Sequence, residues 1–407
     1  MIVVALEWLT YGIGRLAASA RRRGIHLVVL TADPSAYGAE LVEAERSGAA
    51  IVVVLDTSDT AAVREHLRSI RDLGGLISTT DTWSLTAVQL AEELGLPSQN
   101  PAGVRTARDK VELRNRLHEA GLSTSPGFRI DPSSISHDDF RAVPLPFIAK
   151  DSAGTGSRNV WTALDAGDVG AIVDAVRRAE LRGSLAVEPY FLGPLYSIEA
   201  ISSAGETRAL GVSSRIMPPP PCFREDGNAF PVLLPAPLRE TVEHWIVEVL
   251  QAVGLTDGFT HTEFIITRGG IEVVEVNPRL GGGLIGEMIE RSLGIDLSEA
   301  FLDLALGLRP RLMEATLTPC TALAEVDLYA PSAGVFEGID GTSLLPLHPG
   351  EPELHRSKAP GSRVVSTEDH RGGVGSVLAS GATTELALSN ALAAAGKLRV
   401  RMATASP

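Results

Sequence analysis

His261-Thr-Glu-Phe-Ile-Ile-Thr-Arg-Gly-Gly-Ile-Glu-Val-Val-Glu-Val-Asn-Pro-Arg-Leu-Gly-Gly-Gly283 is the stretch of sequence that decides the fold. Two runs rich in β-branched residues stand on either side of Arg268-Gly-Gly270. Short apolar runs separated by a glycine-containing turn are typical of a β-hairpin. We therefore expect two antiparallel strands here, followed by a turn rich in proline and glycine.

Polar side chains share one face of this predicted hairpin. Because side chains alternate along a strand, Glu275, Asn277 and Arg279 point the same way. Glu263 on the first strand can lie across from them. Carboxylate and amide oxygens suit Mg²⁺, and a neighbouring guanidinium suits a phosphate or carboxylate. The alternative is an exposed face of paired charges, but such a face would not need the proline and three glycines that follow.

A second segment predicts phosphate binding. Pro146-Phe-Ile-Ala-Lys150 reads as a strand, and Asp151-Ser-Ala-Gly-Thr-Gly-Ser-Arg-Asn159 follows as a loop of small and hydroxyl residues. Such a loop can turn N–H groups and hydroxyls toward phosphate oxygens while the lysine supplies a point charge. The G-x-x-x-x-G-K-[ST] pattern is absent from the sequence, which disfavours a P-loop fold. Read alone, the loop is equally compatible with a flexible turn.

Secondary-structure patterns divide the chain into four parts. Residues 1–104 alternate short apolar runs with helical stretches, which predicts a parallel sheet with crossover helices. Residues 105–188 begin with a charged helix at about Thr106 to Ala120 and continue as a small α+β unit. Residues 189–318 contain the hairpin, and residues 319–407 form a C-terminal α+β subdomain. The expected fold class is therefore α/β and α+β.

Length and composition indicate a globular protein that acts on small molecules. The chain has 407 residues, 44% of them hydrophobic, and a net charge of −14, which opposes attraction to nucleic acid or anionic membranes. No apolar run reaches the roughly 20 residues of a membrane span, and no secretory signal pattern is visible, so we expect a cytoplasmic location. Cys222 and Cys320 form no metal or redox motif. The oligomeric state is left open, with a homodimer among the alternatives.

Together these motifs resemble the ATP-grasp superfamily, and within it the carboxylate–amine ligases similar to L-amino-acid ligases (dipeptide synthetases) and carnosine synthase. The resemblance covers nearly the whole chain. It implies an N-terminal parallel α/β domain, a two-lobed ATP-grasp fold and a C-terminal subdomain. It also implies an ADP-forming ligase that uses ATP and Mg²⁺, with Mn²⁺ as a substitute ion. Such an enzyme activates a small carboxylic acid, such as an amino acid, as an acyl phosphate and couples it to an amine.

The same resemblance assigns roles to individual residues. The implied adenine hinge is the segment from Val187 to Glu199, in which Glu188 and the backbone of Tyr190 and Phe191 would meet the base. The residues expected at the nucleotide are Lys110, Lys150, Ser152, Gly154, Thr155, Gly156, Ser157, Glu188, Tyr190, Phe191, Glu263 and Glu275. The implied metal ligands are Glu263, Glu275 and Asn277, and the implied catalytic residues are Arg279 and Lys150. The candidates for contact with the substrates are Arg215, His261, Arg279, Gly282 and Gly283.

Some of these assignments have alternatives. Relatives usually carry a glutamate for the ribose where this chain has Leu195, and Glu199 lies too far along the strand to replace it. Arg215 and Arg224 are candidate carboxylate clamps, although they flank a proline run that could be a stiff spacer. Gly281 to Gly283 precede a predicted helix, so their N–H groups could bind an anion or simply form a tight turn.

Three rival functions are compatible with parts of the sequence. Gly12-Ile-Gly14 follows a predicted strand and Asp33 lies about 20 residues on, a pattern found in NAD-dependent oxidoreductases. That reading leaves the polar hairpin and Lys150 unexplained. A nucleotide-binding regulator without catalysis would be expected to lose metal ligands, whereas all three positions are filled here. An ATP-grasp enzyme of the carboxylase type is the remaining alternative.

Overall fold

The computed structural model of the chain describes residues 1–9 and 12–403. The N-terminal part is the parallel sheet that the alternation of strands and helices predicts, with the strand order β3-β2-β1-β4. Its strands are β1 (Ile2–Leu6), β2 (His26–Thr31), β3 (Ala50–Val54) and β4 (Leu73–Ile77). Its helices are α1 (Ile13–Arg22), α2 (Gly38–Arg46), α3 (Thr60–Ser69) and α4 (Ser84–Glu93).

The charged helix expected at Thr106 to Ala120 is two helices, α5 (Pro101–Arg108) and α6 (Lys110–Glu119). Asp109 separates them with an extended backbone conformation, and its carboxylate accepts hydrogen bonds from the Val111 and Glu112 N–H groups. A side-chain acceptor of this kind satisfies the free N–H groups at a helix start. The break therefore makes Lys110 the first residue of α6.

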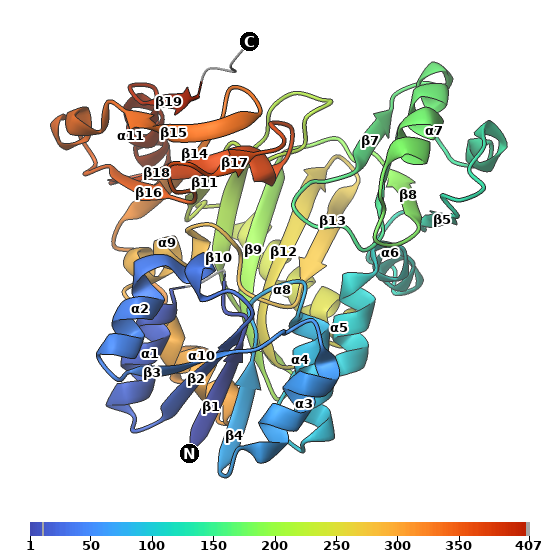
Figure 1. Cartoon of the computed structure of the whole chain (residues 1–407). Helices are drawn as coiled ribbons and strands as arrows, with labels where there is room; N and C mark the ends of the chain where they lie inside the picture. The colour runs from blue at the N-terminus through green and yellow to red at the C-terminus, as the bar shows by residue number, and fades with distance from the viewer. Residues whose placement is uncertain (10–11, 404–407) are drawn as a thin grey trace.

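A small antiparallel sheet follows, in the order β5-β8-β6-β7. It consists of β5 (Phe128–Ile130), β6 (Phe147–Asp151), β7 (Val160–Ala163) and β8 (Leu185–Pro189), with α7 (Val169–Arg178) packed on it. Its apolar residues form a core of their own, in which Phe140 and Phe147 stack with their ring centroids 5.3 Å apart. Figure 1 shows this unit in green, to one side of the remaining sheets.

The largest sheet has eight strands in the order β13-β12-β9-β10-β11-β14-β18-β16. Its strands are β9 (Leu195–Ser203), β10 (Glu206–Ile216), β11 (Gly227–Phe230), β12 (Gly258–Thr267), β13 (Gly270–Asn277), β14 (Ala322–Tyr329), β16 (Glu353–Arg356) and β18 (Gly373–Gly381). Strands from both sides of residue 319 thus share one sheet, through the antiparallel pair β11 and β14. A three-stranded sheet is formed by β15 (Gly334–Asp340), β17 (Arg363–Val364) and β19 (Arg399–Met402).

Four further helices cover these sheets: α8 (Ala236–Val253), α9 (Ile285–Leu293), α10 (Leu297–Ala305) and α11 (Thr384–Ala395). Helices α9 and α10 share a core with the N-terminal sheet, where the rings of Trp8 and Phe301 meet edge to face at 4.8 Å. Gly75 in β4 allows the close approach, since a Cβ there would lie 2.4 Å from the carbonyl oxygen of Ala305. This packing holds the ends of the N-terminal strands near the polar hairpin. Among the described helices, none is both long and apolar enough to span a membrane.

Candidate active site

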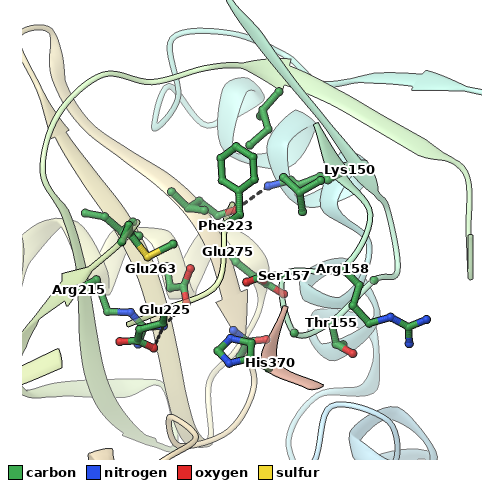
Figure 2. Close-up of a pocket in the computed structure, with 18 of the residues that line it drawn as sticks. Lys150, Thr155, Ser157, Arg158, Arg215, Phe223, Glu225, Glu263, Glu275 and His370 are labelled. Atoms are coloured by element: carbon green, nitrogen blue, oxygen red, sulfur yellow. Dashed lines mark hydrogen bonds and ion pairs between the residues drawn. The ribbon is translucent and has the colours of Figure 1, made fainter. Parts of the chain in front are cut away.

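One cavity of about 820 Å³ collects most of the residues that the sequence singled out. Its walls come from the β6–β7 loop, the segment after β8, the β12–β13 hairpin, β10, β14 and the C-terminal loop that carries His370. Figure 2 shows Arg215, Glu225 and Glu263 on one side of this cavity, and Thr155, Ser157 and Arg158 on the other. Residues from both ends of the chain therefore meet at one site.

Two buried lysines lie at the phosphate-loop end of the cavity. Lys150 on β6 forms an ion pair with Glu188 and donates to the carbonyl oxygen of Val274 at 3.2 Å. Lys110 at the start of α6 donates to the carbonyl oxygen of Gly154 at 2.7 Å and lies 3.4 Å from a Glu275 carboxylate oxygen. The two lysines come from different elements and both line the cavity, where their charges can attract a polyanion such as a triphosphate.

The loop between β6 and β7 supplies part of the predicted phosphate cradle. Gly154, Thr155, Gly156 and Ser157 line the cavity, and Gly156 and Ser157 both have positive φ angles. Ser152 does not line it, which corrects the sequence prediction. Its hydroxyl accepts a hydrogen bond from the Ser184 hydroxyl at 3.2 Å, and its side chain is buried in the base of the loop.

The hinge after β8 is held by Arg114, a residue that the sequence did not single out. Arg114 on α6 pairs with Glu188 at 3.1 Å and with Glu272 at 3.3 Å, and it lies over the Phe191 ring at 4.9 Å. Burial would raise the pKa of Glu188, but Lys150 and Arg114 together lower it, so the carboxylate stays ionised. Glu188 is therefore bound to two cations and positions the hinge.

Tyr190 and Phe191 line the cavity as predicted, but the Tyr190 N–H is already used. It donates to the carbonyl oxygen of Pro146 at 3.0 Å, so of the two Tyr190 backbone groups the carbonyl is the one left for an adenine base. Leu195 also lines the cavity. Glu199 is fully buried and accepts hydrogen bonds from His261 and from the Gly281 N–H, so it is not free to bind a ribose.

The hairpin places the predicted metal ligands together. Glu263 and Glu275 are cross-strand partners, and a bulge after Glu263 turns the Val274 carbonyl toward Lys150. Asn277 lies opposite His261 at the end of β13, and none of the bonds recorded among the described residues involves its side chain. Two carboxylates and a free amide oxygen are a donor set that fits Mg²⁺. Although burial would raise the pKa of Glu263, Arg215 and His261 lower it, so the Glu263 carboxylate stays ionised.

Arg279 lies just beyond these ligands and lines the same cavity. Its Nε and one terminal nitrogen donate to both carboxylate oxygens of Asp81, with the Nε bond at 2.9 Å, and its other terminal nitrogen donates to the Leu280 carbonyl. Arg108 adds a second cation 3.4 Å from Asp81. Asp81 lies just after the carboxyl end of β4. Ligands of parallel α/β sheets bind at the carboxyl ends of the strands, so its position in the sequence could have identified Asp81 as a candidate site residue.

The candidate substrate residues are more tightly paired than the sequence suggested. Arg215 binds Glu225 at 2.9 Å and Glu263 at 2.8 Å, so it is not a free carboxylate clamp. His261 contacts Glu199 through Nδ1 and Glu263 through Nε2, the latter at 3.5 Å. Burial alone would lower the pKa of His261, but the Glu199 carboxylate raises it to about 9. Arg224 lies over the Tyr329 ring at 3.9 Å and pairs with Asp226, which gives it a structural role.

The glycine turn before α9 is only partly open to an anion. Gly282 and Gly283 line the cavity, as expected. However, the Gly281 N–H donates to Glu199 at 2.9 Å and the Leu284 N–H donates to Glu325 at 3.0 Å. Glu199 thus occupies one of the three glycine N–H groups that the sequence had suggested for an anion, and Glu325 occupies the N–H group that follows them.

Three carboxylates that line the cavity were not predicted from the sequence: Glu225, Glu325 and Asp327. Burial raises the pKa of Glu225 to about 7, with Glu263 and Glu325 adding to the effect and Arg215 opposing it. Glu325 and Asp327 are two residues apart on a strand and therefore share one face, a pattern from which the sequence could have predicted an acidic surface.

The N-terminal glycine motif does not form a nucleotide site. Gly12 caps α1, and the Gly14 N–H donates to the Glu40 carboxylate at 3.2 Å, where a dinucleotide phosphate would be expected. Asp33 accepts a hydrogen bond from the Ser35 N–H in a short turn. The oxidoreductase alternative is therefore disfavoured.

Comparisons with known proteins agree with this arrangement. Residues 17–98 match the ATP-grasp N-terminal domain family, residues 107–283 the ATP-grasp domain family, and residues 328–403 the family of L-amino acid ligase C-terminal domain 2. The uncharacterized protein y4rH of Sinorhizobium fredii is 28% identical over 89% of this chain and 74% of its own length. Human carnosine synthase 1 is 24% identical over 72% of this chain, which spans only 38% of that enzyme.

A solved structure shares the fold over its full length. The L-amino acid ligase from Bacillus licheniformis superposes with a TM-score of 0.84 at 19% identity, covering 99% of both chains. The three family matches follow one another along the sequence and cover the cavity's phosphate loop, its hairpin and the C-terminal loop that carries His370. The chain is an enzyme of the ATP-grasp superfamily of ligases.

Proposed function

We propose that this enzyme uses ATP to activate a small carboxylic acid as an acyl phosphate and couples it to an amine, releasing ADP and phosphate. The observation that supports this most strongly is one cavity that holds two buried lysines, a hard-oxygen donor set and Arg279. Relatives named as L-amino acid ligase and carnosine synthase make an amino acid a suitable acid substrate.

The proposed roles follow from position and charge. Lys110, Lys150 and the loop Gly154–Ser157 would neutralise the triphosphate. Glu263, Glu275 and Asn277 would hold Mg²⁺, which when bound supplies positive charge at the transferred phosphoryl group. No protein nucleophile is needed, because the substrate carboxylate attacks the phosphorus and the amine later displaces phosphate.

Arg279 has donors to spare for the acid. A guanidinium has five N–H donors, and three of them are used by Asp81 and Leu280, which leaves one on each terminal nitrogen. A planar pair of donors matches a carboxylate and can stabilise the oxyanion that forms when the amine attacks. Asp81 fixes the direction in which this pair points.

We expect a screen of amino acids, other acids and amines with Mg²⁺ and ATP to yield ADP and phosphate in equal amounts, together with an amide product. The reason is that both lysines and the phosphate loop converge beside the hairpin carboxylates, where the terminal phosphates would lie. Phosphorus NMR distinguishes the products. AMP and pyrophosphate would overturn the proposed chemistry.

A further inference from the structure

Glu225, Glu325 and Asp327 form an acidic cluster on the part of the cavity wall built by β14 and the segment between β10 and β11. Glu225 lies between β10 and β11, and the other two lie on the same face of β14. All three line the cavity that holds the proposed metal ligands. Figure 2 shows Glu225 beside Arg215, across from Ser157 and Arg158.

The positive charge near this cluster does not balance it. Among the described residues, Arg215 is the cation recorded in an ion pair with Glu225, and it is shared with Glu263. Glu325 accepts hydrogen bonds from the Leu284 N–H and from Asn228, whereas no recorded side-chain bond involves Asp327. Burial, together with Glu325 and Glu225, raises the pKa of Asp327 to about 8, as expected for carboxylates with too few cations.

Two buried acceptors in the same wall lack a donor. Glu225 is 8% exposed and Asn228 is 3% exposed. Within residues 1–9 and 12–403, neither Oε1 of Glu225 nor Oδ1 of Asn228 has a hydrogen-bond partner. Buried polar atoms are normally hydrogen-bonded, and those left without a partner are costly. Both residues line the cavity, so a bound molecule that carries several N–H donors would satisfy them.

The arrangement does not suit a single metal ion. In the described part of the chain, no three Asp, Glu, His or Cys side chains are placed to hold one. An organic cation with several N–H donors, in contrast, can pair with more than one of these carboxylates and with the Asn228 amide oxygen at once.

We propose that one of the two substrates carries an ammonium or guanidinium group in its side chain, in addition to its reacting group and any α-ammonium, and that Glu225, Glu325 and Asp327 bind this side-chain cation. The inference rests on the proposed ligase function and specifies its substrate class: a basic amino acid or a similar polyamine. Reaction at the far end of the molecule would then take place beside Arg279 and the hairpin ligands.

The test is a calorimetric titration of the full chain, with Mg²⁺ and ADP present, using matched pairs of ligands. L-Arginine is compared with its neutral isostere L-citrulline, and L-lysine with L-norleucine. We expect at least one cationic member to bind about tenfold tighter or more than its neutral counterpart, because charge-assisted hydrogen bonds are stronger than neutral ones. Asp327→Asn and Glu225→Gln should each bring this ratio toward one. Asp340→Asn is the matched control, since Asp340 is exposed on β15 and bonds to Arg401.

The inference is overturned if neither cation binds, if charged and neutral ligands bind alike, or if both cavity variants keep the wild-type ratio. Phosphate release with a panel of partner amines and acids is measured separately. A charge-dependent ratio that the variants abolish, without ATP consumption by any pair, would support the cation subsite and count against the ligase proposal. If neutral pairs consume ATP and binding shows no charge preference, the ligase proposal is supported and the cation subsite is ruled out.

Discussion

Replacing Arg279 with lysine is expected to lower kcat by about 10²–10³, the usual cost of losing a donor to a developing oxyanion, while the affinity for ATP is nearly retained. Lysine keeps the positive charge but loses the planar pair of donors that remains after Asp81 and Leu280 are bound. Arg279 lies beyond the metal ligands, whereas the nucleotide is expected at Lys110, Lys150 and the hinge. Steady-state kinetics and ATP titrations measure the two effects separately.

Arg268→Lys is the matched control for this variant. Arg268 is exposed in the turn of the same hairpin, so its replacement should leave kcat at the wild-type value. Near-normal turnover of Arg279→Lys would remove Arg279 from the catalytic residues. If Arg279→Lys lowered the affinity for ATP as much as it lowered kcat, Arg279 would be assigned to nucleotide binding instead.

Glu275→Gln is expected to weaken ATP binding in the presence of Mg²⁺ by about tenfold or more and to lower kcat/KM by at least about 10², because a metal at a phosphoryl oxygen contributes several kcal/mol. Without Mg²⁺, the same variant should bind ATP as well as the wild type or better. The reason is that the removed negative charge lies beside Lys110, where it would repel phosphate.

Binding of ATP is therefore measured with Mg²⁺ and with a chelator in its place. Glu248→Gln serves as the control, because Glu248 is exposed on α8 and is not among the described residues that line the cavity. If Glu275→Gln weakens ATP binding equally with and without Mg²⁺, Glu275 is not a metal ligand.

The hairpin and its polar face were predictable because local rules decide them. A glycine turn between two β-branched runs sets the strands, and the period of two puts Glu275 and Asn277 on one face. The structure confirms the cross-strand pairing of Glu263 with Glu275. The parallel N-terminal sheet was predictable for the same kind of reason, since strands and helices alternate along the chain.

What the sequence did not reveal depends on contacts between distant segments. Asp81 reaches Arg279 only because α9 and α10 pack on the N-terminal sheet. The acidic wall exists because β14 pairs with β11, about 95 residues earlier in the chain, and no local pattern specifies such a pairing. The helix break at Asp109 is a local effect, because Asp109 caps the start of α6. It was not predicted from the sequence because helix-forming residues run without interruption on both sides of Asp109.

The most direct test of the central claim is the fate of carboxylate oxygen. A productive acid labelled with ¹⁸O in its carboxyl group is incubated with the enzyme, Mg²⁺, ATP and the amine, and the released phosphate is analysed by mass spectrometry or phosphorus NMR. If an acyl phosphate forms, one labelled oxygen passes from the acid to inorganic phosphate for each amide made. Unlabelled phosphate, or label in AMP, would contradict the account.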